Sequence, residues 1–206
     1  MNSPMLSRPR RPSRDDVVAV TRTWIEQAVI GLNLCPFAKA VYVSERVRYA
    51  VSDAVTTGAL QDDLARELGT LAQAAPTAID TTLLIHPNVL TDFADYNAFL
   101  DVADATVRAL GLVGVLQVAS FHPAYQFAGT VPDDVTNCTN RSPYPMLHLL
   151  REASIDRAVA AGPEARTIYQ HNIETMRRLG IKGWMALGVG ALKDPKLEGS
   201  PCRSPR

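Results

Sequence analysis

Two short runs, TTLLIHP at residues 81–87 and VGVLQVASFHP at residues 113–123, decide the fold that we expect for this chain. Each is a β-prone apolar run that ends in His-Pro. Proline lacks the N–H that a strand ladder needs and restricts the residue before it, so each proline ends its strand. A third run, 46–51, places Val47, Tyr49 and Val51 at every second position, which is typical of a half-buried strand.

Segments with helical periodicity separate these runs. Apolar faces with helical spacing occur at about 17–32, 60–71 and 93–110, and we expect further helices at about 144–153, 154–162 and 164–179. Strands that alternate with long helices favour right-handed crossover connections. The sequence therefore predicts an α/β fold with a small, mainly parallel sheet of about three to four strands, covered by helices, with the C-terminal helices packed on it.

The charge of the chain is divided unevenly along its length. Its 206 residues carry 21 Lys+Arg and 21 Asp+Glu. Residues 1–14 hold four arginines and no acid, and residues 191–206 hold four basic and two acidic residues, which leaves 13 basic and 19 acidic residues in 15–190. We expect disordered basic tails at 1–14 and 191–206 around a single α/β domain at 15–190. An acidic body argues against nucleic acid as a partner, because that affinity comes from neutralising phosphates.

Compartment and cofactor signals are sparse. The apolar runs are too short to span a bilayer, and the N-terminal segment lacks the apolar core of a signal peptide, although its arginines and serines are also typical of transit peptides. Cys35, Cys138 and Cys202 are widely spaced and odd in number, which argues against a disulfide framework and favours the cytoplasm. The sequence contains neither of the glycine-rich phosphate-binding motifs, GxGxxG and GxxxxGK(S/T). The cofactor and the oligomeric state are left open.

His86 and His122 follow the two His-Pro strands directly. In a parallel sheet both would lie at the carboxyl edge, where open α/β sheets bind ligands. Because neighbouring strands are about 4.8 Å apart, the two imidazoles could share one pocket. The alternative is that His-Pro only ends each strand and leaves the imidazole in solvent.

Residues 122–143 show no periodicity, and such long loops are usually functional or disordered. Gln126 and Asn140 belong to a set of uncharged hydrogen-bonding residues there, and Arg141 is the single cation between Arg108 and Arg151. A guanidinium binds carboxylate or phosphate through two parallel hydrogen bonds, so the loop is a candidate site for a small anionic molecule. The alternative is that Arg141 pairs with Asp133 or Asp134 and holds the loop.

The residues after Arg141 extend this candidate site. Ser142, Pro143 and Tyr144 are suited to starting the helix expected at 144–153, and the free amides of a helix start bind anions. His148 would lie in the first or second turn of that helix and either line the same pocket or pack. The sequence thus predicts Gln126, Asn140, Arg141, Tyr144, His86 and His148 as ligand-binding residues.

Three hypotheses for function follow. In the first, the protein binds a small anionic metabolite at the carboxyl edge of the sheet, and an enzyme of this kind would use His122 as general acid or base because its pKa lies naturally near neutrality. In the second, Cys35 and His122 form a thiol-dependent redox or covalent catalyst. In the third, the protein is a non-enzymatic partner-binding protein. No metal site is predicted, because no two of the candidate ligands have helical i,i+3 or i,i+4 spacing.

Five segments resemble the bacterial family known as the domain of unknown function 1415. They are VIGLNLCPFAKAV (29–41), DTTLLIHP (80–87), DFADYNAFLDVAD (92–104), GVLQVASFHPAYQFAG (114–129) and PDDVTNCTNRSPYPMLHLLREASIDRAV (132–159). The resemblance covers about residues 15–180 and leaves out both tails. Cys138 stands where the family usually has an aromatic residue, so the resemblance makes Cys138 a poor candidate for catalysis. The family's name implies no substrate, cofactor or mechanism.

Overall fold

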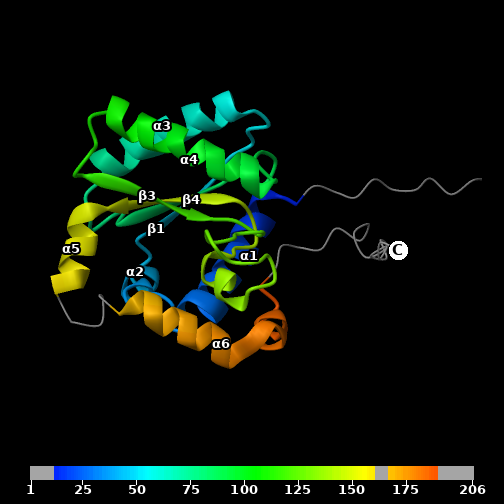
Figure 1. Cartoon of the computed structure of the whole chain (residues 1–206). Coiled ribbons are helices and arrows are strands. Elements are labelled where there is room, and N and C mark those ends of the chain that lie inside the picture. Colours follow the sequence, from blue (N-terminus) through cyan, green and yellow to red (C-terminus); the bar gives the residue numbers. More distant parts are fainter. Residues whose placement is uncertain (1–11, 161–166, 190–206) are drawn as a thin grey trace, which may run out of the picture.

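A single four-stranded sheet with helices around it organises the chain (Figure 1). The computed structural model describes residues 12–160 and 167–189, and the strand order is β1-β2-β4-β3. The elements are, in chain order, α1 (Arg14–Trp24), the π-helix η1 (Ile25–Ile30), α2 (Ala38–Val43), β1 (Val47–Val51), α3 (Thr57–Gln73), β2 (Thr81–Ile85), α4 (Phe93–Ala109), β3 (Leu116–Phe121), the 3-10 helix η2 (Val135–Asn140), β4 (Met146–Arg151), α5 (Glu152–Ala160) and α6 (Ile168–Ala186).

The α/β class and the number of strands are confirmed, but the sheet is mixed rather than mainly parallel. Only β1 and β2 pair in parallel. β4 is antiparallel to both β2 and β3 and lies between them. The predicted strands at 46–51 and 81–85 form as β1 and β2, and the run at 113–121 forms β3 only from Leu116 onward. The expectation of a mainly parallel sheet is wrong because it did not include β4.

β4 occupies the segment where we expected a helix at 144–153. Leu147 and Leu149 are fully buried against α3 and α4, whereas Met146 packs in the core on the opposite face of the sheet. A central strand buried on both faces has a continuous apolar run rather than an alternating one, and periodicity alone cannot distinguish such a run from a buried helix. The helix expected from Ser154 to residue 162 also begins earlier, because α5 follows β4 directly from Glu152.

Two layers of helices enclose the sheet (Figure 1). α3 and α4 cover one face and form a core with Leu84, Leu116, Leu147 and Leu149. The opposite face packs against α1, η1 and the C-terminal end of α6, which contribute to the second core. α5 lies at one end of the sheet.

The helix ends follow local chemistry. The side chain of Ser13 accepts a hydrogen bond from the backbone N–H of Asp16 while Asp16 accepts from the N–H of Ser13, and this capping box starts α1. Within α6, Gly180 has a φ of 67°, a left-handed conformation that favours glycine, and it interrupts the helical path. The helix expected at about 164–179 therefore ends where a kink interrupts the longer helix α6.

The expected tails lie largely outside the described residues. Ser13 and Arg14 are described as the cap and the first residue of α1, whereas residues 1–11 and 191–206 are not described. In the described part of the chain, no helix has the length and apolar character needed to cross a membrane.

Candidate functional site

His86 and His122 lie at the same end of the sheet, on the face covered by α4. β2 and β3 run in the same direction but are separated by β4, so the two histidines are not on neighbouring strands. The ring of Tyr96 contacts both imidazoles, with centroid distances of 5.8 Å to His86 and 5.0 Å to His122. The expected common edge is confirmed, and an aromatic side chain of α4 fills the space between the histidines.

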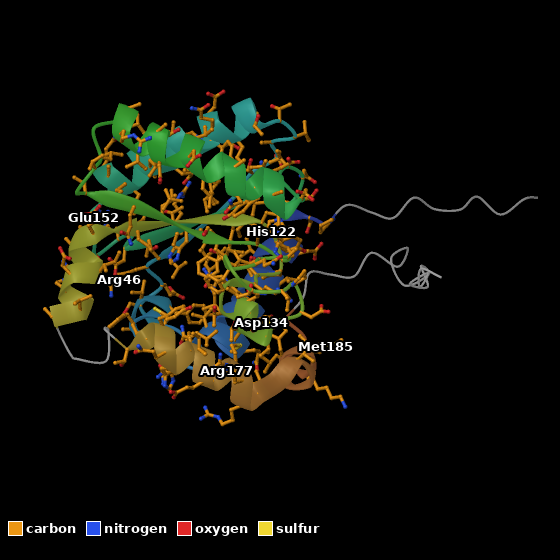
Figure 2. The ribbon with its side chains drawn as sticks, viewed as in Figure 1. Arg46, His122, Asp134, Glu152, Arg177 and Met185 are labelled. Atoms are coloured by element: carbon orange, nitrogen blue, oxygen red, sulfur yellow. The ribbon has the colours of Figure 1, made fainter. Side chains whose placement is uncertain are left out.

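Both ring nitrogens of His122 bind the main chain. The N–H of Ala124 donates to Nδ1 at 3.0 Å, so the neutral ring carries its proton on Nε2, which donates to the carbonyl of Leu90 at 3.2 Å. The side chain is fully buried at the start of the loop (Figure 2), and burial lowers its pKa. In this arrangement His122 links the start of the loop 122–143 to the main chain at Leu90, and neither ring nitrogen is available to a substrate.

His86 has one unused nitrogen. Its Nδ1–H donates to the carbonyl of Val89 at 3.0 Å, and its buried Nε2 has no hydrogen-bond partner among the described residues. Burial lowers the pKa of His86 to about 4. The side chain is fully enclosed and stacked on Tyr96, so it is a neutral core residue.

His148 lies on the opposite face of the sheet from His86 and His122. It belongs to β4 rather than to a helix, and its ring contacts Phe121. The hydroxyl of Thr81 donates to the carbonyl of Leu149, so the 2.7 Å contact between that hydroxyl and Nε2 is donated by the imidazole. Burial lowers the pKa of His148 to about 4. The three histidines therefore do not line one pocket.

The polar residues of the loop 122–143 hold one another's main chain. Arg141 donates from Nε to the carbonyl of Tyr125 at 3.3 Å and from a terminal nitrogen to that of Pro132 at 2.6 Å. Gln126 donates to the carbonyl of Thr130 at 2.6 Å. Arg141 thus secures the loop through carbonyl oxygens, and no ion pair joins it to Asp133 or Asp134 within the described residues.

Asn140 extends the edge of the sheet and also lines a small pocket. Its carbonyl accepts from the N–H of His122 at 3.2 Å, and its side chain donates to the carbonyl of Ser120 at 3.1 Å. The pocket beside it has a volume of about 160 Å³ and lies between the loop and α6, with Thr139 and Asn172 in its wall. Figure 2 shows Asp134 in this loop and Arg177 on the facing helix α6.

Tyr144 and the cysteines lie apart from these groups. Tyr144 is buried in the second core and precedes a strand, so the anion site expected at a helix start there does not form. Cys35 is half-buried in the turn before α2, and no contact joins it to His122 in the described structure. Burial raises the pKa of Cys138, which is fully buried. No three His, Cys, Asp or Glu side chains of the described residues are grouped to hold a metal ion.

A larger concavity lies along β1. This β1 groove has a volume of about 520 Å³ and runs between residues 48–54 and the side of α3 that carries Asp63, Arg66 and Glu67; Arg14 of α1 also lines it. Its volume falls within the range of about 300–1,000 Å³ that is usual for ligand pockets. It includes the carboxyl end of β1, which lies at the same end of the sheet as that of β2, but none of the predicted ligand-binding residues lines it.

Ion pairs order the charged residues of the β1 groove. Arg48 donates to both oxygens of Glu67, at 2.7 and 3.2 Å. Asp63 accepts from Ser52 at 2.5 Å with one oxygen and from Arg66 at 2.6 Å with the other. Burial opposes the ionisation of Asp63, but the hydrogen bonds from Ser52 and Arg66 outweigh it and lower its pKa.

The third ion pair of the groove lies between Arg14 and Asp53. The side chains of Arg14 and Arg66 remain 65% and 61% exposed, so both are accessible from solvent. The acids of the groove are largely engaged, whereas each of its three guanidinium groups keeps N–H donors that no described residue accepts.

None of the groove's charged residues was among the predicted site residues. Asp63, Arg66 and Glu67 flank the leucine stripe of α3, where charges are normally solvated. The one available signal for this groove was Arg48, which takes a polar position in the short strand β1, and Ser52 follows the end of that strand. Local spacing could not show that α3 lies over this side of β1.

The fold and the groove define an α/β protein with a mixed four-stranded sheet and a charged groove beside its edge strand β1. The chain belongs to the family described as "Protein of unknown function (DUF1415)", whose model matches residues 16–186. No curated protein and no solved structure matches the chain. Family membership is thus established, and its description carries no activity or ligand.

Proposed function

We propose that this protein binds a small anionic molecule at the carboxyl edge of its sheet, in the β1 groove. The observation that carries the proposal is the imbalance between donors and acceptors there. Both oxygens of Asp63 and of Glu67 already accept hydrogen bonds. In contrast, the guanidinium groups of Arg14, Arg48 and Arg66 retain N–H groups for which no described residue is the acceptor. A carboxylate or phosphate supplies the acceptors that such guanidinium groups bind best.

The proposal assigns binding and no chemical step. His122 was the expected general acid or base, and its two nitrogens are both held by the main chain. Cys35 has no described contact that would activate it as a nucleophile. Cys35 and Cys138 are both free thiols, which supports the cytoplasm as the proposed location.

The experiment is equilibrium unfolding in succinate, citrate or phosphate, with chloride at matched ionic strength as the reference. A ligand that binds only the folded state at 100 times its Kd stabilises that state by about 2.7 kcal/mol. We expect stabilisation by at least one of these anions and its loss in Arg14→Gln/Arg66→Gln, since both side chains are exposed and contribute little to folding.

Arg108→Gln serves as the control variant, because Arg108 is an exposed residue in the last turn of α4, outside the groove. It should respond to anions as the parent protein does. Equal stabilisation of the parent and of the double variant would contradict the proposal.

A further inference from the structure

One side of the β1 groove is an edge of the sheet that pairs with no other strand in the described part of the chain. The N–H of Ser52 donates to the carbonyl of Ile85 at 2.8 Å, and the carbonyl of Arg46 accepts from the N–H of Asp80 at 2.9 Å. In a parallel ladder the N–H and C=O of one residue point to the same side, and this side alternates along the strand. The even-numbered residues of β1 therefore face β2, and Val47, Tyr49 and Val51 direct their main-chain groups away from the sheet.

No described residue pairs with these outward groups. β1 is the first strand in the order β1-β2-β4-β3, and none of the described main-chain or side-chain hydrogen bonds reaches the N–H or C=O of Val47, Tyr49 or Val51. Tyr49 and Val51 also line the β1 groove, although their side chains pack with the core on the other face of the sheet. The groove therefore meets these two residues at their main chain.

We infer that the ligand of the β1 groove is a short, extended, acid-bearing peptide that adds to β1 as a further strand. The inference rests on the proposed function and specifies the ligand class. An open strand edge beside a helix is a recognised arrangement for strand addition, in which main-chain hydrogen bonds supply affinity and wall side chains supply specificity. Here the outward groups of β1 bind the peptide main chain.

Charge complementarity selects the acidic peptide. α3 forms the wall of the groove above the sheet face, and its Asp63 and Glu67 accept through both oxygens, whereas Arg66 of α3 and Arg48 of β1 keep N–H groups that no described residue accepts. A carboxylate side chain on the strand face that points toward α3 would reach these donors. A basic side chain on that face would meet the guanidinium groups of Arg48 and Arg66, and the carboxylates of Asp63 and Glu67 beside them already accept hydrogen bonds through both oxygens.

The test is a fluorescence-polarisation titration of a labelled, terminally blocked peptide, Thr-Val-Glu-Val-Thr, against the full chain, with succinate as the small-anion probe. Each backbone amide of the peptide is N-methylated in turn. Added strands use every second amide, so methylation should weaken binding about tenfold or more at alternate positions and leave the intervening positions unchanged. The Glu→Gln peptide should also bind at least tenfold more weakly.

Hydrogen exchange gives an independent readout. The peptide should slow exchange of the amides of Tyr49 and Val51, which pair with no described residue, and leave those of Arg48 and Ala50 unchanged. The double substitution Arg14→Gln/Arg66→Gln should weaken binding of the acidic peptide, and the control substitution Arg108→Gln should leave binding unchanged.

The outcomes separate the inference from the proposed function. Succinate binding without the alternating methylation pattern would overturn strand addition and leave anion binding standing. The alternating pattern with equal affinity for the Glu and Gln peptides would retain strand addition and contradict the anionic ligand. A dimer in sedimentation that protects Tyr49 and Val51 in the absence of peptide would overturn the inference, because a second copy would then occupy the edge.

Discussion

Arg48 and Glu67 illustrate how single residues set the character of the β1 groove. The carboxylate of Glu67 is only 6% exposed, and both of its oxygens accept from Arg48. A buried carboxylate that loses its partner keeps its desolvation cost without compensation, whereas an exposed ion pair contributes little. Arg48 therefore supports the fold as well as the groove, and the exposed Arg14 and Arg66 are better probes of ligand binding.

The Arg48–Glu67 pair predicts coupled effects on stability. Arg48→Gln should lower the free energy of unfolding by about 1–3 kcal/mol because it leaves Glu67 buried and unpaired. Glu67→Gln in the same chain should restore part of that loss. Urea unfolding of the parent, both single variants and the double variant measures this coupling. Strictly additive effects would show that the pair is not coupled.

Tyr96 is a second residue whose role can be isolated. Its hydroxyl donates to the carbonyl of Met146 at 2.8 Å and accepts from the N–H of Phe121 at 3.0 Å, so it bridges the ends of β4 and β3. Tyr96→Phe keeps the ring and should cost about 1–3 kcal/mol in unfolding free energy, because a buried and a half-buried main-chain group lose their partner. A change below about 0.5 kcal/mol, the usual range for inconsequential surface changes, would mean that this bridge contributes nothing.

At the scale of elements, most of the fold follows from local sequence. The His-Pro endings, the period-two run at 46–51 and the helical stripes all formed where the sequence predicts them, because neighbouring residues determine them. β4 did not, because Met146, Leu147, Leu149 and Arg151 are strong helix formers and their strand conformation depends on pairing with β2 and β3. The β1 groove was not predicted for the same reason, because it depends on how α1, β1 and α3 pack together.

The strand assignment of β4 predicts unequal effects of two adjacent leucines. Leu149 is fully buried beneath α3 and α4, whereas Leu150 points to the other face and is half-buried. Leu149→Ala should cost about 2–5 kcal/mol, as truncations in a packed core do. Leu150→Ala is the matched control and should cost clearly less in the same urea unfolding assay. Equal costs would contradict the alternation of faces along β4.

At the scale of the whole molecule, three histidines at the sheet are neutral: His86 and His122 are fully buried, and His148 is half-buried in β4. Burial lowers the pKa of His86 and of His148 from 6.5 to about 4, and it also lowers that of His122. The unfolded chain therefore takes up protons as the pH falls through 6.5, and the folded chain does not. The contribution of these histidines to the free energy of unfolding is fully present above pH 6.5 and is lost progressively as the pH falls toward 4.

Protonation of His86 in the unfolded chain should by itself lower the free energy of unfolding by about 3 kcal/mol between pH 6.5 and pH 4. His86→Asn retains a donor for the carbonyl of Val89 and no longer titrates, so its stability should decline less between pH 6.5 and 4, relative to its own value at pH 7.5. Urea unfolding at each pH gives both curves. Parallel curves for the parent and the variant would contradict the burial of a neutral His86.

The location of the anion is the central claim, and an NMR titration of the ¹⁵N-labelled full chain with succinate tests it most directly. We predict that the shifted signals are the Nε–H groups of Arg14, Arg48 and Arg66 and the amides of residues 48–54. Signals that shift instead around Gln126, Asn140 and Arg141 would contradict the β1 groove and return the ligand to the loop. The absence of any shift at saturating succinate, citrate and phosphate would contradict anion binding itself.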